Sequence, residues 1–172
     1  MENLKSLEAL QEQLSKLPGV GKKSAERMAY ALLDFPDEEL KDIAKAISSL
    51  KEKIHFCPIC GMITDIDGCY ICDDKNREED TIMVVCFPKD VLSIERSGAF
   101  NGQYHVLNGE ISLSKGMDVS SLNIDSLLDR VEKGNFKEII LATNPTVDGE
   151  TTAAYLNKLL ENNKSKITTP LV

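Results

Sequence analysis

The feature that most restricts what this chain can fold into is a set of four cysteines in two Cys-x-x-Cys pairs: Cys57, Cys60, Cys69 and Cys72. Each pair places two thiolates at neighbouring corners of a tetrahedron, and the full spacing C-x2-C-x8-C-x2-C is typical of a structural zinc site. Two disulfides, or two unrelated cysteine pairs in a core, are the alternatives. Because four thiolates fill the coordination sphere of zinc, such a site stabilises a fold and leaves no position for catalysis.

The N-terminal sequence, the length of the apolar runs and the cysteine spacing together indicate the compartment in which the protein is found. The N-terminus begins an amphipathic pattern rather than a secretory signal, and no apolar run in the 172 residues has the length of a membrane span. Thiols spaced for a metal are most stable where disulfides do not form. We therefore expect a cytoplasmic protein with no membrane partner.

Charge is distributed unevenly along the chain. The formal net charge is −8 at pH 7. Residues 1–36 contain five basic and five acidic side chains, so the whole excess of negative charge falls on residues 37–172. A polyanion such as DNA is therefore expected to bind at the N-terminal end.

Residues 3–54 are predicted to be helical because their apolar residues recur at helical spacing. The pattern breaks at 17–21, a second helix begins near Lys22, and a third follows Pro36. We expect the apolar stripes of these helices to form a core. The stripe of the third helix consists of Leu40, Ile43, Ala44, Ile47 and Leu50.

From Thr81 onward, short apolar strands alternate with helices. Strands are predicted at 81–86, 103–107 and 138–142, with one more beginning near 165–168, and helices at 88–95, 121–133 and 151–161. This alternation predicts an α/β fold with a doubly wound parallel sheet. The chain is thus divided into a helical module at 1–53, a cysteine region at 54–76 and a sheet domain at 77–172.

The break between the first two helices has the features of a helix-hairpin-helix motif. Its two glycines favour positive φ and a close approach of the backbone to phosphate, and the start of the next helix attracts an anion. A basic cluster adds charge on the same side, so binding would depend on the DNA backbone and not on its sequence. An ordinary turn with solvated lysines is the alternative. The predicted DNA-binding residues are Gly19, Gly21, Lys22, Lys23 and Arg27.

A second candidate site follows the strand predicted at 138–142. Asp148 and Glu150 flank Gly149 at the carboxyl end of this strand, where open α/β sheets usually bind ligands. Two carboxylates in a loop are possible ligands for Mg²⁺. Alternatively, they cap the following helix and stabilise its positive end.

Taken together, the chain resembles the RecR family of bacterial recombination mediators over nearly its whole length. The stretches that carry the resemblance are the Leu-Pro-Gly-Val-Gly hairpin, Cys-Pro-Ile-Cys, Cys-Tyr-Ile-Cys, Pro88–Val91, Tyr104–Gly109 and Leu141–Glu150. The resemblance implies a helix-hairpin-helix module, a four-cysteine zinc finger and a Toprim domain. It further implies that Lys23 and Arg27 contact DNA.

The same resemblance implies partners and a mode of action. The partners are DNA and the proteins RecO and RecF, and the chain is expected to form a homo-oligomer, either a dimer or a tetrameric ring. Such a clamp encircles DNA and helps to load recombinase at gaps. No catalytic residue is expected.

One departure from the family concerns the Toprim acids. Relatives have Val-Val-Glu-Glu-Pro after the first Toprim strand, whereas this chain has Val-Val-Cys86-Phe-Pro. With only Asp148 and Glu150 left, Mg²⁺ binding is expected to be weak and phosphoryl transfer is not expected. Cys86 is interpreted as a buried small hydrophobic residue, and His105 as a strand residue with no functional role.

A second departure is the end of the chain. Relatives continue with a Gly- and Pro-rich segment that helps to close the ring, whereas this chain ends at Thr169–Val172. We therefore expect ring closure and the contact with RecO to be affected.

Three functions remain open from the sequence. The first is a non-catalytic mediator that binds DNA and recruits partners. The second is a Mg²⁺-dependent Toprim enzyme that acts on DNA phosphodiesters through Asp148 and Glu150. The third is a zinc-stabilised module whose acidic face binds a basic protein.

Overall fold

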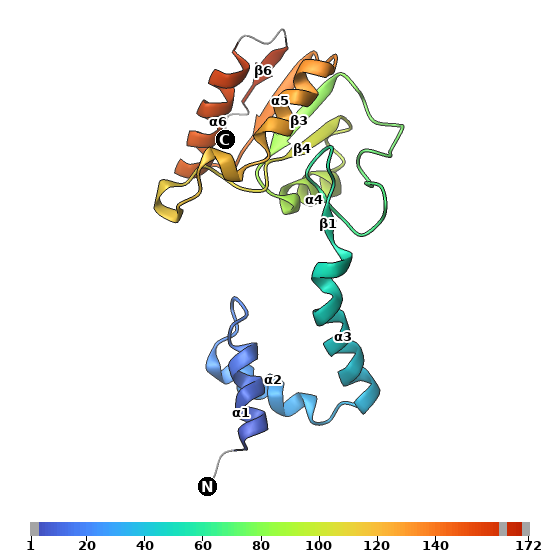
Figure 1. Ribbon diagram of the computed structural model, residues 1–172, viewed down its shortest axis with the longest axis vertical. Helices are drawn as coiled ribbons and strands as arrows, with labels where there is room; N and C mark the ends of the chain where they lie inside the picture. Colours follow the sequence, from blue (N-terminus) through green and yellow to red (C-terminus); the bar gives the residue numbers. More distant parts are fainter. Residues whose placement is uncertain (1–3, 162–164, 170–172) are drawn as a thin grey trace. The chain divides into compact units, whose positions relative to one another are not determined.

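The structure is a computed structural model that describes residues 4–161 and 165–169. It divides into two compact units, Met1–Lys53 and Ile54–Val172, which are described separately (Figure 1). The first residue of the predicted helical segment and the end of the chain beyond Thr169 lie outside the described residues.

The first unit consists of the helices α1 (Lys5–Leu14), α2 (Lys22–Leu32) and α3 (Asp37–Lys53). In this unit α1 packs against α2 (Figure 1). The residues buried there are Leu7 of α1 together with Ala25 and Ala29 of α2. Because Ala25 and Ala29 are four residues apart, they lie on one face of α2, and their small side chains allow the two helices to approach closely.

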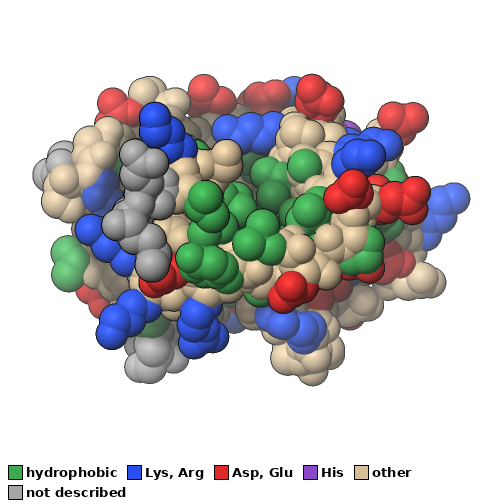
Figure 2. Space-filling view, turned by 90° about the horizontal axis from the view of Figure 1, so that it is seen from below, with side chains coloured by type: hydrophobic (Ala, Val, Ile, Leu, Met, Phe, Trp, Pro, Cys, Tyr) green, Lys and Arg blue, Asp and Glu red, His purple; other side chains and the backbone are tan. Residues whose placement is uncertain are grey.

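The prediction that the stripe of the third helix belongs to the core is wrong. No residue of α3 is buried, and Ile47 is 71% exposed. The periodicity correctly predicted an amphipathic helix, but among residues 4–53 the extensive helix packing is between α1 and α2 and does not include α3. Figure 2 shows hydrophobic side chains exposed together among charged ones on the face that it presents. Contiguous exposed hydrophobic residues of this kind are typical of a protein–protein interface.

The second unit contains a four-stranded parallel sheet with the order β4-β3-β5-β6. Its strands are β3 (Thr81–Val85), β4 (Gln103–Val106), β5 (Glu138–Ala142) and β6 (Lys166–Thr168). They are connected by the helices α4 (Pro88–Ser97), α5 (Ile124–Lys133) and α6 (Val147–Leu160). Because β4 and β5 lie on opposite sides of β3, the chain reverses its winding direction at this strand, which confirms the α/β class and the doubly wound parallel sheet.

The two faces of this sheet are covered differently, because successive strand residues point to opposite sides. One face packs against α5 and α6, and its cluster includes Ile82, Val84, Ile139, Leu141, Leu127 and Leu156. The other face packs against α4 and the cysteine region, in a cluster that includes Val85, Val91, Tyr104, Val106, Cys57, Cys60 and Cys69. The cysteine region therefore helps to bury the sheet.

Some boundaries differ from the prediction for local reasons. Helix α6 begins at Val147 and not at residue 151, because the Thr146 hydroxyl accepts a hydrogen bond from the Gly149 amide at 3.1 Å and caps the helix. Helix α5 begins at Ile124, after the 3-10 turn η2 (Val119–Ser121). The remaining short elements are β1 (His55–Phe56), β2 (Ile63–Thr64) and η1 (Leu113–Lys115). No helix in the described part of the chain has the length and hydropathy needed to cross a membrane.

His105 of β4 is fully buried and is held by two hydrogen bonds. Its Nε2 donates to the Asn123 carbonyl at 2.7 Å, and its Nδ1 accepts from Arg130 Nη1 at 3.3 Å. Burial lowers the pKa of His105 from its usual 6.5 to about 4. The imidazole is therefore neutral in the folded protein at neutral pH.

This lowered pKa predicts a loss of stability in mild acid. Between pH 6.5 and 4 the unfolded chain binds a proton at His105 that the folded chain does not, so the contribution of His105 is complete above pH 6.5 and declines toward pH 4. The decline should not exceed about 1.4 kcal/mol per pH unit. Urea unfolding of the native protein and of His105→Gln across this range measures it, and equal pH slopes for the two proteins would contradict the prediction.

Candidate functional site

The four predicted metal-binding cysteines lie together in the second unit. The sulfur atoms of Cys57 and Cys72 are 3.9 Å apart, and those of Cys60 and Cys69 are 3.5 Å apart. All four sulfur atoms lie within 4.8 Å of one another. A tetrahedral zinc ion with Zn–S bonds of about 2.3 Å separates its sulfur ligands by about 3.8 Å, whereas a disulfide bond is only about 2.0 Å long. The arrangement is therefore consistent with a metal site and not with two disulfides.

The first cysteine pair is held in place by the sheet. Strands β1 and β2 form an antiparallel pair on either side of it, and the Gly61 amide donates to the Cys57 carbonyl at 2.9 Å. The Cys60 carbonyl accepts from the Val106 amide at the end of β4, at 2.7 Å. Gly61 has φ of +75°, and a Cβ there would lie 2.4 Å from the Val106 carbonyl oxygen, so only glycine permits this contact.

The second cysteine pair is stabilised within its own loop. The Cys69 amide donates to the Asp73 carboxylate at 2.8 Å, and the Asp73 amide donates to the Cys69 carbonyl at 2.9 Å. Behind this loop, Arg77 forms an ion pair with Glu95 of α4, and the Tyr104 hydroxyl donates to the same carboxylate at 2.8 Å. These contacts connect the segment that follows the second pair to α4 and β4.

The electrostatics of the cluster favour a bound cation. A hydrogen bond with Cys72 and burial raise the pKa of the Cys60 thiol, and burial raises the pKa of Cys69 to about 11. Thiols this close together do not ionise in water-poor surroundings unless a positive charge compensates them. A divalent metal ion supplies that charge, and the donor set of four sulfurs is the one that structural zinc sites use.

The predicted hairpin lies between α1 and α2. Gly19 has φ of +82°, whereas Gly21 is extended with φ of −77°, so only the first of the two glycines adopts the positive φ that we expected of both. Space is open where a Cβ would stand at either glycine. The Val20 amide closes the turn by donating to the Leu17 carbonyl at 3.0 Å.

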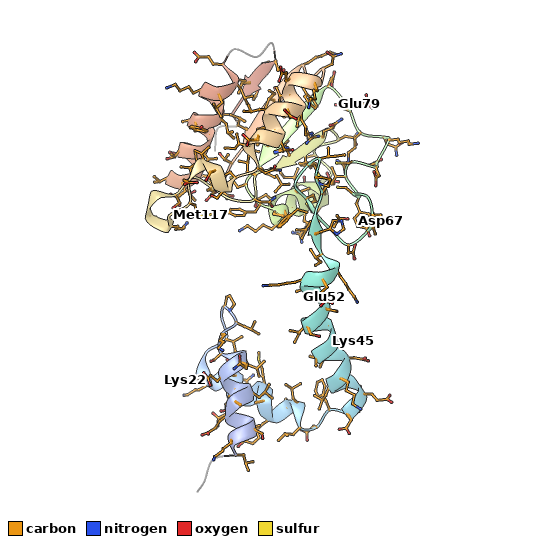
Figure 3. All side chains as sticks on the ribbon, viewed as in Figure 1. Lys22, Lys45, Glu52, Asp67, Glu79 and Met117 are labelled. Carbon is orange, nitrogen blue, oxygen red and sulfur yellow. The ribbon has the colours of Figure 1, made fainter. Side chains whose placement is uncertain are left out.

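The start of α2 is suited to an anion. Gly21 is the N-cap and offers no side-chain hydrogen bond, and the first turn of α2 contains no acidic residue. The first amides of the helix therefore have no side-chain acceptor within the cap, and the helix dipole is uncompensated there. Lys22, Lys23 and Arg27 are all exposed (Lys22 is labelled in Figure 3).

The two predicted Toprim acids lie in the first turn of α6. Lys115 Nζ is 3.0 Å from Asp148 Oδ2, and a hydrogen bond from Ser112 together with this ammonium group lowers the pKa of Asp148. Glu150 is exposed. A Cβ at Gly149 would lie 2.1 Å from the Asn144 carbonyl oxygen, so this glycine allows the loop to pass close to the helix. Thr146, and neither of these carboxylates, caps α6, but both lie in its first turn at the positive end of the helix dipole, which stabilises them.

Cys86 directly follows strand β3 and is fully buried. Burial raises its pKa to about 12, and the nearby Glu110 carboxylate adds to this effect. A thiol with such a pKa is not a nucleophile at neutral pH. Glu110 Oε1 also accepts a hydrogen bond from Asn144 Nδ2 at 2.6 Å, across the loop that precedes α6.

Sequence reasoning missed three side chains at these sites: Glu110, Lys115 and Arg130. Each contacts a residue at least 20 positions away, and none belongs to a motif with a recognisable spacing. A signal was available for Arg130 alone, since it lies at the edge of the buried apolar stripe of α5.

Comparisons with known proteins cover both units. The helix-hairpin-helix family of RecR matches residues 7–51, and the Toprim domain family matches residues 80–169. The chain is 45% identical over 157 residues to recombination protein RecR of Pelotomaculum thermopropionicum, which covers 91% of this chain and 78% of the relative. It is 46% identical over 154 residues to recombination protein RecR of Lactobacillus johnsonii, covering 89% of this chain and 77% of the relative.

Proposed function

The chain belongs to the RecR family of recombination proteins, and from this membership we propose that it is a non-catalytic DNA-binding mediator of recombinational repair in the cytoplasm. In this proposal several copies form a clamp on DNA, bind RecO and RecF, and help to load recombinase at gaps. The observation that best supports it is the hairpin with its uncapped helix start and exposed basic cluster, in an otherwise acidic chain.

We propose three modules with separate tasks. Residues 1–53 bind DNA and assemble the oligomer, residues 54–76 bind zinc, and residues 77–172 form the Toprim-like platform. The zinc is held by Cys57, Cys60, Cys69 and Cys72 and is purely structural, because four thiolates leave no open position on the ion. The zinc ion cross-links the cysteine region and supplies no reactive group.

DNA contact is assigned to Gly19, Gly21, Lys22, Lys23 and Arg27. A phosphate bound at the start of α2 would receive amide hydrogen bonds and the charge of the side chains that surround it. One hairpin makes few such contacts, so a single chain binds weakly. Several hairpins in one oligomer raise the effective concentration of each and produce useful affinity without new contacts.

The exposed stripe of α3 supports the oligomer. Replacing Ile47 with glutamate is expected to dissociate the assembly, because it places a charge in the centre of an apolar contact. Light scattering after size-exclusion chromatography measures the mass. Ser48→Glu, which introduces the same charge at the next exposed position of α3, is the matched control and should assemble normally. Equal masses for the native protein and Ile47→Glu would contradict the role of this stripe.

The acidic loop is proposed to take no part in catalysis. Asp148 is already paired with Lys115, and the fully buried Cys86 offers no carboxylate. We therefore expect no nicking of supercoiled plasmid at millimolar Mg²⁺, and the same DNA affinity for Asp148→Ala as for the native protein. Mg²⁺-dependent nicking that disappears in Asp148→Ala would contradict this proposal and favour a Toprim enzyme.

The function as a whole is tested by the solution mass with and without duplex or gapped DNA. A clamp predicts a species of several chains on DNA and an affinity that falls steeply between two salt concentrations. A strict monomer that binds no DNA at either salt concentration would contradict it and favour a module that binds only proteins.

A further inference from the structure

Arg130 of α5 is a largely buried cation whose hydrogen bonds all go to uncharged groups. Its guanidinium donates to the Tyr104 carbonyl at 2.7 Å, to Gln103 Oε1 at 2.8 Å and to His105 Nδ1 at 3.3 Å. Within residues 4–161 and 165–169, no carboxylate forms an ion pair with it. Burying a charge without a counter-charge is costly, so the position of Arg130 calls for an explanation.

The cavity beside this guanidinium is lined by one of the four cysteines and by the carboxylates of Asp74 and Glu79, neither of which forms an ion pair with Arg130. Arg130 and Cys72 line the same cavity, which has a volume of about 470 Å³. One helical turn before Arg130, the Ser126 hydroxyl donates to the carbonyl of Ile59, within the first cysteine pair, at 3.4 Å. The side chain of Tyr104, whose carbonyl accepts from Arg130, packs in the same cluster as three of the cysteines. Helix α5 thus holds Arg130 beside the metal centre.

The charges are complementary. Four thiolates and one divalent ion carry a net charge of minus two, in a site where three of the four cysteines are buried. Burial lowers the pKa of Arg130, and the thiolate charges of all four cysteines oppose this effect. In surroundings with little water, the attraction between such groups is screened less than at the surface.

We propose that Arg130 is a positioning residue of the metal centre, whose guanidinium balances the negative charge of the four-thiolate complex and slows the loss of zinc. The proposal depends on the four cysteines holding zinc, as assigned above. It also connects the metal to the sheet, because the same guanidinium bonds to three successive residues of β4. Metal and sheet are therefore expected to stabilise each other through one side chain.

The test compares variants that separate charge from hydrogen bonding. Arg130→Met removes the charge, Arg130→Lys keeps the charge but loses most of the hydrogen bonds, and Lys133→Met removes a charge from the same helix at a side chain that is 74% exposed. The full chain is loaded with zinc, and zinc release to a chromogenic chelator is followed by absorbance. Arg130→Met should release zinc about tenfold faster or more, as is usual when a group that supports the ligands is lost. Lys133→Met should match the native protein.

Arg130→Lys distinguishes a charge effect from a merely structural one. If the charge matters, this variant unfolds at a lower temperature than the native protein but retains zinc nearly as well. Zinc release about tenfold faster than from the native protein, in a folded Arg130→Lys, would contradict the proposal. This comparison with the native protein holds even if Arg130→Met does not fold. Native zinc retention by a folded Arg130→Met would overturn the role of Arg130 and leave the metal assignment intact. A native protein that takes up no zinc would overturn both.

Discussion

Replacing Cys60 with alanine is expected to abolish zinc binding and to destabilise residues 54–172 by several kcal/mol. Structural zinc contributes on the order of 10 kcal/mol to small metal-organised folds, and three remaining thiolates hold the ion far less well. Cys60 is also fully buried in the cluster that covers the α4 side of the sheet. The effect should therefore reach the sheet and not only the cysteine loop. Zinc content by mass spectrometry and thermal unfolding measure the two parts of the prediction.

Cys86→Ala is the matched control for this change. Cys86 is also fully buried, and the substitution removes the same sulfur atom, but Cys86 lies outside the metal cluster. We expect it to retain one zinc per chain and to lose about 1–2 kcal/mol from the small cavity alone. Equal zinc content in Cys60→Ala and Cys86→Ala would show that Cys60 is not a ligand.

Reversing the charges of Lys23 and Arg27 is expected to abolish DNA binding while the fold remains intact. Both side chains are exposed on α2, so replacing them with glutamate removes two attractive charges and adds two repulsive ones near the same phosphates. The affinity should fall roughly a hundredfold or more at low salt, and the slope of log affinity against log salt should decrease by about 2. Fluorescence anisotropy of labelled duplex DNA over a salt series measures both.

The control for this experiment changes the same charges elsewhere. Lys41 and Lys45 are exposed and four residues apart on α3, just as Lys23 and Arg27 are on α2 (Lys45 is labelled in Figure 3). Lys41→Glu with Lys45→Glu produces the same change in net charge, but away from the hairpin. If both double variants lose the same affinity, net charge and not the hairpin accounts for binding. Unchanged DNA affinity in the variant with Lys23→Glu and Arg27→Glu would contradict the assignment of DNA binding to the hairpin.

Most of the fold was predictable from the sequence because its signals are local. The alternation of short apolar strands with helices predicted the parallel sheet, and the strand at 138–142 has the predicted bounds. The stripe of α3 was misassigned for an equally physical reason. Periodicity shows that one side of a helix avoids water, but it does not show whether that side packs within the chain or against another molecule. The start of α6 was placed four residues late because the Thr146 cap was not recognised.

The candidate sites also contain features that the sequence predicted and features that it did not. The clustering of the four cysteines was predictable because two Cys-x-x-Cys pairs have the spacing that tetrahedral coordination requires. The pairing of Asp148 with Lys115 was not predictable from the sequence, although it decides how much negative charge the acidic loop presents. The proximity of Glu110 to Cys86 was not predictable either. No spacing rule connects such residues, because the loops that bring them together have no regular period.

By itself, the sequence determined the four-cysteine cluster, the hairpin, the order of strands and helices, and the family. All of these depend on residues close to one another in the chain, where backbone geometry alone imposes the spacing. Only the tertiary structure decided that the cysteine region covers one face of the sheet, and that Arg130 of α5 stands beside it. Those contacts join elements that are not neighbours along the chain, and packing of the sheet brings them together, so they become visible only in the folded protein.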